Sequence, residues 1–220
     1  MTILAIDTCE NYCSSAVLLA SGEVYAAADA IGRGHAEHLI PQFEGLMSEA
    51  GIEYADITRV AVTTGPGTFT GLRIGLSVAR GVALAQRIPC VGLTALSVLA
   101  AQVQEKQQAD YVYSVMKGRG GQVFVQTFEG IGTSGQPKAL HEPKNIDEAD
   151  AIKLIGERPG VVAGSGAQLL GLESDYSFID PAVLARLAVE LEPADFPPEP
   201  TYYRQADAAK AKRLIPIGED

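Results

Sequence analysis

The chain has 220 residues, with 17 Lys and Arg against 27 Asp and Glu, so its formal net charge is −10 at pH 7. Apolar residues make up 47% and charged residues 20%, which is typical of a globular protein and excludes the disordered and fibrous classes. An acidic chain lacks the clustered cations that autonomous nucleic-acid binding requires. We expect no membrane contact and a cytoplasmic location, because no run approaches the roughly 20 apolar residues of a membrane span and Asp7 interrupts the first apolar run.

The first half of the chain combines short apolar runs with segments of helical periodicity. Apolar residues recur at three- and four-residue steps from Leu39 to Ala50, and Gly51 would end that helix. We therefore predict the order βββαβα, with strands at 2–7, 13–19 and 23–28, a helix around 39–50, a strand at 57–63 and a helix at about 70–86. A strand at 90–93 and a helix at about 95–104 should follow.

The second half repeats this order more weakly. We predict strands at 111–116, at 122–128, near 138–141 and at 160–163, and helices at 146–155 and 181–191. This repetition predicts an α/β fold of two ribonuclease-H-like lobes, each a mixed sheet flanked by helices, with domains at 1–104 and 105–220. Four prolines between Pro193 and Pro200 should keep that segment extended, and a basic tail follows Tyr203.

A glycine-rich block, Gly65-Pro66-Gly67-Thr68-Phe69-Thr70-Gly71, lies between a predicted strand and a predicted helix. Backbone amides at the start of a helix can bind an anion. The glycine spacing differs from the dinucleotide fingerprint, however, and no Lys follows the block as a P-loop requires. We therefore favour a tight turn that lets the helix approach the sheet closely.

Small residues form two rows along the helix that follows this block. They are Gly71, Gly75, Ala79 and Ala83 in one row, and Ser77, Gly81 and Ala85 in the other. Each glycine costs a helix about 1 kcal/mol relative to Ala, so close approach of neighbouring backbones must offset that cost. Two rows suggest two contacts, one with the chain's own sheet and one with another surface flanked by Arg73 and Arg80. Tight intramolecular packing alone remains the alternative.

Two short motifs could serve phosphate chemistry. Asp7 and Thr8 end the first predicted strand, where a carboxylate can hold Mg²⁺ or orient a water molecule, although a lone Asp there is more often a turn residue. Gly164 and Gly166 flank Ser165 after another strand and could contact a phosphate, but the motif is not G-x-S-x-G. ATP or ADP is the cofactor that these four residues would bind.

Cysteine and histidine are too scarce to form an obvious catalytic set. The cysteines are odd in number and include no CxxC pair, which argues against a disulfide framework and a zinc knuckle. His35 and His38 are three residues apart without a recognised metal-ligand pattern, so we interpret them as polar residues at a helix start. All the cysteines and histidines of the chain are Cys9, Cys13, Cys90, His35, His38 and His141.

Four motifs carry a family resemblance. They are Ile6-Asp7-Thr8, Gly34-His35-Ala36-Glu37-His38-Leu39-Ile40-Pro41, the glycine block extended through Leu72-Arg73-Ile74-Gly75, and Pro200-Thr201-Tyr202-Tyr203-Arg204. In these motifs the chain closely resembles the TsaB family, formerly called YeaZ, of the bacterial tRNA threonylcarbamoyladenosine machinery. The resemblance runs from the start to about residue 125 and reappears near residue 200. It implies the two-lobed actin-like ATPase (ASKHA) fold.

The resemblance also implies a subunit without catalytic residues or a metal site of its own. TsaD, a catalytic relative in the M22 group once called glycoproteases, carries two metal-binding histidines four residues apart. The matching positions here are Ala95 and Leu99, which have no lone pair to donate to a metal. The implied role is a scaffold that binds and activates TsaD, which transfers threonylcarbamoyl to adenosine in tRNA.

The same resemblance implies partners and a contact surface. TsaD would form a heterodimer with the chain, and TsaE would join this complex. TsaC would supply the threonylcarbamoyl adenylate, and tRNA would be contacted only indirectly. The chain alone would form a homodimer. The contact would use the helix after the histidine motif and the helix after the glycine block. Its candidate residues are Leu39, Phe43, Leu46, Met47, Gly71, Leu72, Arg73, Gly75 and Ala79. On this basis Gly75→Leu should weaken partner binding.

Two other function classes stay open. An ATP-dependent kinase or hydrolase of the actin-like class would use Asp7 as the carboxylate on the magnesium side and Gly164–Gly166 near a phosphate. An M22-type metallopeptidase would contain stoichiometric zinc or iron.

Overall fold

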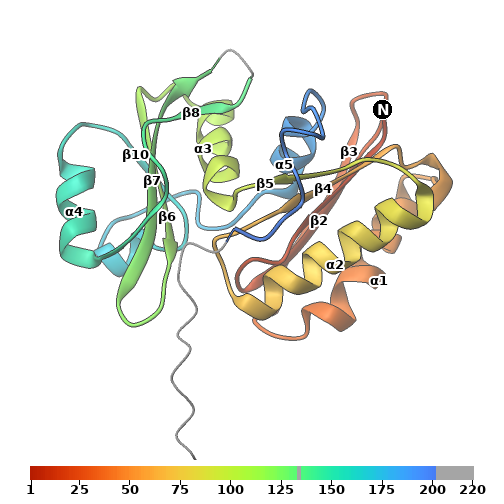
Figure 1. The fold of residues 1–220 in the computed structure, drawn as a ribbon, viewed down its shortest axis with the longest axis horizontal. Coiled ribbons are helices and arrows are strands. Elements are labelled where there is room, and N and C mark those ends of the chain that lie inside the picture. Colours follow the sequence, from red (N-terminus) through yellow and green to blue (C-terminus); the bar gives the residue numbers. More distant parts are fainter. Residues whose placement is uncertain (133–134, 202–220) are drawn as a thin grey trace, which may run out of the picture.

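The computed structural model describes residues 1–132 and 135–201, which form two β-sheets joined by helices (Figure 1). The first sheet has the order β3-β2-β1-β4-β5. Its strands are β1 (Ile3–Asp7), β2 (Tyr12–Leu18), β3 (Val24–Ala30), β4 (Arg59–Thr63) and β5 (Cys90–Leu93). The first three strands are antiparallel neighbours, whereas β1, β4 and β5 run parallel. All five strands predicted from the sequence here are confirmed.

The second sheet has the order β10-β6-β7-β8, and β9 also pairs with β7. Its strands are β6 (Tyr111–Lys117), β7 (Gln122–Ile131), β8 (Pro137–Ala139), β9 (Lys144–Asp147) and β10 (Val161–Ala163). The sequence prediction of a helix from residue 146 was wrong at its start, because residues 144–147 pair with β7. The helix α4 (Glu148–Gly156) begins only after Asp147, whose side chain caps it by accepting a hydrogen bond from the Asp150 amide.

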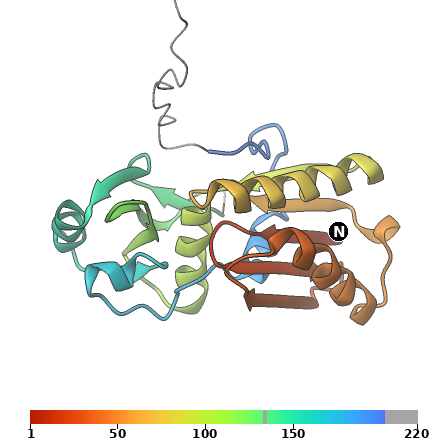
Figure 2. The ribbon, with the colours of Figure 1, turned by 90° about the horizontal axis from the view of Figure 1, so that it is seen from below.

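Helices cover both faces of the first sheet. α1 (His35–Glu49) and α2 (Phe69–Gln86) pack on one face around Leu4 and Ile6, and α5 (Pro181–Leu187) packs on the other face around Ile3 and Ala5. Figure 2, which views the molecule from below, shows α1 and α2 on the side of the sheet that faces the viewer. α3 (Ala95–Lys106) packs on the second sheet and touches α5. Two short 3₁₀ helices, η1 (Tyr54–Asp56) and η2 (Ala167–Leu170), complete the described chain.

The two halves of the sequence exchange helices. We call the first sheet with α1, α2 and α5 the first lobe, and the second sheet with α3 and α4 the second lobe. α3 and α5 each pack on the sheet built mainly by the other half of the sequence. The proposed boundary between residues 104 and 105 falls inside α3, and a division of the chain at that point stays a prediction.

The chain after α5 returns along the first sheet. The helix predicted to reach residue 191 ends at Leu187, which leaves backbone carbonyls beyond it free to accept hydrogen bonds from Arg59. Residues 193–200 are not helical, but residues 193–195 form a turn, whereas the prolines predicted that the whole segment would be extended. This segment lies along β5, where the Gly92 amide donates to the Phe196 carbonyl at 2.9 Å.

Two expectations concern the ends of what the structure describes. Among the described residues, no helix is both long enough and apolar enough to span a bilayer. The basic tail expected after Tyr203 lies outside the described residues.

Candidate partner interface and interlobe cleft

The glycine block forms a tight turn between β4 and α2. The Thr68 amide donates to the Cys9 carbonyl at 2.7 Å, and the Thr68 hydroxyl caps α2 by accepting from the Gly71 amide at 3.2 Å. A Cβ added at Gly67 would collide with the backbone of Cys9. The turn therefore lets the start of α2 approach the end of β1, and the preferred interpretation of this block is confirmed.

The first row of small residues faces the chain's own sheet. A Cβ added at Gly71 would meet the carbonyl oxygen of Thr8, and one added at Gly75 would meet the Thr8 hydroxyl. Ala79 and Ala83, farther along the row, are buried as well. The gain that offsets the cost of these glycines is thus contact between α2 and β1 within one chain. This corrects the expectation that the row itself admits a partner.

Most of the expected interface residues lie inside the protein. Eight of the nine are buried, namely Leu39, Phe43, Leu46, Met47, Gly71, Leu72, Gly75 and Ala79. The α1 residues join Leu4 and Ile6 in a shared apolar cluster. Helical periodicity identifies the apolar side of a helix, and here that side covers the sheet. Only Arg73 of the nine is exposed.

A different side of α1 and α2 remains exposed. We call it the outer face, and it comprises Ile40, Phe69, Arg73, Ser77, Gly81, Leu84 and Ala85. Leu84 is 81% exposed and Phe69 is 51% exposed, which is unusual for side chains of this size. The Arg73 guanidinium lies over the Phe69 ring, 3.8 Å from its centroid. The second small row, Ser77, Gly81 and Ala85, thus points away from the protein's own core.

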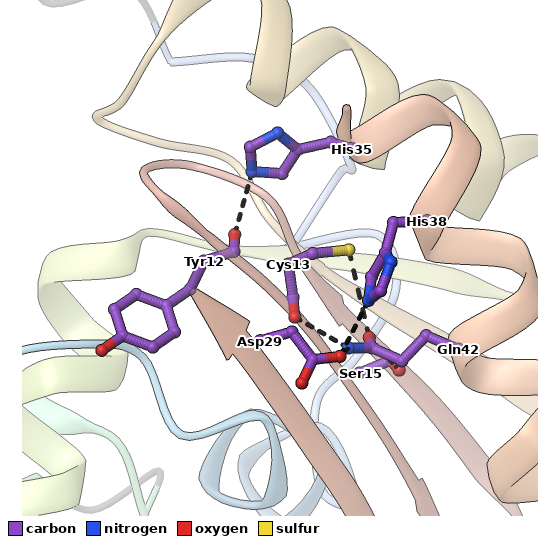
Figure 3. A network of polar contacts seen from close by, with 7 residues as sticks. All are labelled: Tyr12, Cys13, Ser15, Asp29, His35, His38 and Gln42. Atoms are coloured by element: carbon purple, nitrogen blue, oxygen red, sulfur yellow. Dashed lines mark hydrogen bonds and ion pairs between the residues drawn. The ribbon is translucent and has the colours of Figure 1, made fainter. Parts of the chain in front are cut away.

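Polar side chains at the start of α1 bind β2 and β3 (Figure 3). The Asp29 carboxylate accepts hydrogen bonds from His38 Nε2 and Gln42 Nε2, both at 2.8 Å. These two hydrogen bonds lower the pKa of Asp29. His35 Nε2 donates to the Tyr12 carbonyl at 3.1 Å. The two histidines are therefore polar residues that anchor the start of the helix, as predicted.

This network does not provide an accessible nucleophile. Cys13 and Ser15 are fully buried, and the Ser15 hydroxyl donates to Gln42 Oε1 at 2.7 Å. Burial, together with the charges of Asp7 and Asp29, raises the pKa of Cys13 to about 12, so the thiol stays protonated near neutral pH. Within the described ranges, no group of three or more His, Cys, Asp and Glu is placed to hold a metal ion.

A cleft of about 1470 Å³ lies between the two lobes. Its walls come from the β1–β2 turn, the start of α2, the β6–β7 turn and the segment after β10. The charged residues that line it are Glu10, Arg73, Lys117, Arg119, Glu173 and Asp175. Anions and cations therefore both face this space, which gives the cleft no single sign of charge.

The four residues predicted to bind a nucleotide are largely committed to the fold. Asp7 is buried and does not line the cleft; its Oδ1 accepts from the Thr63 hydroxyl at 2.6 Å. Burial raises the pKa of Asp7 despite that hydrogen bond. The Thr8 hydroxyl donates to the Gly71 carbonyl at 2.7 Å.

The glycines after β10 are engaged in the same way. Gly164 lines the cleft, but its amide donates to the Tyr176 carbonyl at 2.6 Å. The Gly166 amide donates to the Val115 carbonyl at 2.9 Å. Both amides are thus engaged within the chain, and a nucleotide-binding role for these glycines stays a prediction. A Cβ at either glycine would meet Val115, so close packing against β6 explains both.

Ala95 and Leu99 occupy the positions that matched metal ligands in the resemblance. Both are buried on α3 in the apolar cluster that extends between the lobes.

Sequence reasoning missed Glu10, whose carboxylate accepts a hydrogen bond from the Ser165 hydroxyl across the cleft. No local pattern identifies such a pair, because 155 positions separate the two residues.

Comparison with known sequences gives a consistent result. A family model described as TsaD, tRNA N6-adenosine threonylcarbamoyltransferase, matches residues 29–165. The tRNA threonylcarbamoyladenosine biosynthesis protein TsaB of Escherichia coli K12 is 32% identical over 200 residues, which cover 88% of this chain and 85% of the relative. The TsaB of Bacillus subtilis 168 is 28% identical over 172 residues, covering 77% and 73%.

Solved structures agree with this assignment. YeaZ from Pseudomonas aeruginosa superimposes with a TM-score of 0.78 at 22% identity and covers 91% of this chain and 99% of its own. A second P. aeruginosa structure, described as similar to peptidase YeaZ, has a TM-score of 0.75 at 26% identity and covers 92% and 99%. With the two-lobed fold, these matches confirm the ASKHA architecture. The chain belongs to the TsaB (YeaZ) family of tRNA threonylcarbamoyladenosine biosynthesis proteins.

Proposed function

We propose that the chain is a non-catalytic subunit of the complex that transfers threonylcarbamoyl to adenosine in tRNA, and that it binds and activates TsaD. TsaE is the further partner proposed, tRNA is contacted only indirectly, and the chain pairs with a second copy when TsaD is absent. The same proposal includes a cytoplasmic location. The observation that carries it is the outer face of α1 and α2, where large apolar side chains and a row of small residues are exposed together.

The outer face has the composition of a helix-packing surface. Ser77, Gly81 and Ala85 would let another helix approach α2 closely, because small side chains reduce the distance between two helix axes. Leu84 and Ile40 would fill the space beside that contact. Phe69 with its stacked Arg73 supplies the aromatic and guanidinium groups that often dominate binding energy.

Reconstitution tests the role in transfer. Purified chain, TsaD and TsaE would be combined with tRNA and the adenylate made by TsaC, and the modified nucleoside would be quantified with and without the chain. The proposal requires that omission of the chain abolishes transfer and that the chain alone produces none. Full transfer by TsaD and TsaE without it would contradict the proposal.

A matched pair of substitutions tests the surface. Gly81 in α2 and Gly156 in α4 are both exposed helical glycines, and a Cβ added at either meets nothing within 4 Å. Gly81→Arg should weaken TsaD binding and homodimer formation because it adds bulk to the outer face. Gly156→Arg, on the second lobe, should leave both unchanged. Equal effects of the two substitutions, measured by calorimetry and sedimentation, would place the contact elsewhere.

The interlobe cleft favours one second candidate, an ATP-dependent kinase or hydrolase. Its volume exceeds the few hundred Å³ that a small ligand needs, and Arg73, Lys117 and Arg119 line it. Equilibrium dialysis of ATP and ADP against the isolated chain tests this candidate. Tight binding that Lys117→Ala abolishes would favour it over the scaffold role. Metal analysis of the purified chain tests the peptidase class in turn.

A further inference from the structure

Glu10 bridges the two lobes inside the cleft. It belongs to the turn between β1 and β2 of the first lobe, and its Oε1 accepts a hydrogen bond from the Ser165 hydroxyl of the second lobe at 2.5 Å. The Ser165 oxygen in turn accepts from the Lys117 backbone amide at 3.1 Å. The Glu10 carboxyl group is thus bound to Ser165 directly and, through the Ser165 hydroxyl, is linked to the end of β6 at Lys117.

The position of this bridge matters because the lobes are also joined elsewhere. α3 and α5 pack together between the sheets, and apolar residues from both helices share one cluster. Figure 1 shows these helices in the upper half of the view, whereas the start of α2 and the β6–β7 turn, which line the cleft, lie in the lower half. A rotation about the α3–α5 contact would open the cleft and would have to break the Glu10 bridge.

We propose that Glu10, Ser165 and the Lys117 backbone form a latch that holds the cleft closed and that opens when the Glu10 carboxyl group ionises. The latch is made entirely from this chain, so closure needs no ligand. This inference does not rest on the proposed function, since every readout below uses the isolated protein.

Burial of Glu10, more than its charged neighbours, sets the direction of the effect. Burial is the main influence and raises the pKa of Glu10 to about 7; the Asp7 carboxylate adds to this, while the Ser165 hydrogen bond and the Lys117 charge oppose it. Arg73 and Arg119 line the same cleft, and the buried Cys9 thiol lies nearby. The closed form therefore holds the Glu10 proton more tightly than an open form, in which the carboxyl group would be hydrated and would return toward 4.5.

The sign follows from linkage. A group whose pKa is higher in the closed form than in the open form stabilises the closed form. This contribution is complete below the pKa of the open form and is lost as the pH rises to the pKa of the closed form. Closure should therefore weaken between about pH 4.5 and pH 7 and should stay constant above that range. The closed-to-open ratio should fall by roughly two orders of magnitude across this window.

The first experiment measures the latch directly. The ¹³C chemical shift of the Glu10 carboxyl carbon would be followed by NMR from pH 3 to pH 9 in the full chain. A midpoint near 7 is expected. A midpoint near 4.5, the ordinary value for Glu, would overturn the proposal.

The second experiment measures cleft opening by small-angle X-ray scattering at pH 5 and pH 8. The radius of gyration of the wild type should increase at pH 8. Glu10→Gln keeps the size of the side chain but cannot ionise, so this variant should stay compact at both values. Ser165→Ala removes the donor from the opposite lobe and should expand the protein already at pH 5.

Glu173→Gln is the matched control. Glu173 also lines the cleft, and no hydrogen bond from it to the first lobe is seen among the described residues. This variant should keep the pH response of the wild type. A pH-independent wild type, or a pH response that survives in Glu10→Gln, would overturn the latch. Loss of the response in Glu173→Gln would do the same. Circular dichroism would verify that each variant is folded.

Discussion

The Thr8 hydroxyl at the end of β1 donates a hydrogen bond to the Gly71 carbonyl in the first turn of α2 at 2.7 Å. Sequence motifs suggest Thr8 as a possible nucleotide-binding residue and Gly71 as a possible partner contact. In the structure the two residues bind each other. At Gly75, one helical turn farther along, an added Cβ would meet the Thr8 hydroxyl, so α2 packs closely against the first sheet here as well.

This contact predicts different effects for two glycines of α2. Gly75→Leu should lower the free energy of unfolding by about 1–3 kcal/mol, because a larger side chain must displace Thr8 and Ile6. Gly81→Ala should instead raise it by about 0.5–1 kcal/mol, since the site is open and Ala favours the helix. Urea unfolding followed by circular dichroism measures both. A Gly75→Leu protein as stable as the wild type would contradict the packing described.

Leu84 should contribute directly to partner binding. Leu84→Glu would place a charge on the outer face and should raise the Kd for TsaD by at least about tenfold, or roughly 1.4 kcal/mol. The control is Ile152→Glu on α4, since Ile152 is also an exposed aliphatic residue of a helix, with 50% of its surface accessible. Isothermal calorimetry would compare the two. An unchanged Kd for Leu84→Glu would remove α2 from the proposed contact.

Arg59 should be important for stability because it donates hydrogen bonds to the backbone carbonyls that follow α5. One of its guanidinium nitrogens donates to the carbonyls of Ala188, Val189 and Leu191. Arg59→Met would leave these buried acceptors unpaired and should cost about 2–4 kcal/mol of unfolding free energy. Arg119→Met, at an exposed turn, should cost less than about 0.5 kcal/mol. Similar midpoints of denaturation for both variants would disprove this role.

The cysteines should react slowly in the native protein. Burial raises the pKa of Cys13 to about 12 and that of Cys90 to about 11, and it raises the pKa of Cys9 as well. Little thiolate is therefore present at pH 8, and thiolate is the reactive form. Labelling with a chromogenic disulfide at pH 8 should be at least about tenfold slower in buffer than in urea. Equal rates in the two conditions would show that the thiols are accessible.

Asp29 should stabilise the fold only when it is ionised. Hydrogen bonds from His38 and Gln42 hold the pKa of Asp29 below its ordinary value of 3.8. A lowered pKa in the folded state gives stability that is present above 3.8 and disappears as the pH falls through the folded value. The stability difference between wild type and Asp29→Asn should therefore shrink from pH 7 to pH 3. Urea unfolding at both pH values measures this difference, and a difference that stays the same from pH 7 to pH 3 would contradict the role of the Asp29 charge.

Local patterns in the sequence were sufficient to predict most of the elements. Period-two alternation and short apolar runs gave the strands of the first sheet, and three- and four-residue apolar spacing gave α1 and α2. These signals are local, so a single sequence contains them. β9 was missed because its four residues become a strand only by pairing with β7. Beyond the early end of α5, the Ala188 carbonyl similarly accepts from Arg59, which is more than 120 residues away in the chain.

The sequence by itself determined the family, the two-lobed α/β fold and the need for α2 to make close contacts, because motifs, periodicity and glycine cost are properties of neighbouring residues. Only the tertiary structure decided that Gly71 and Gly75 contact the chain's own sheet while Gly81 is exposed. It also brought Glu10 against Ser165. The physical reason is that helical periodicity gives the angle between side chains around a helix, whereas the side that is buried depends on where the rest of the chain packs.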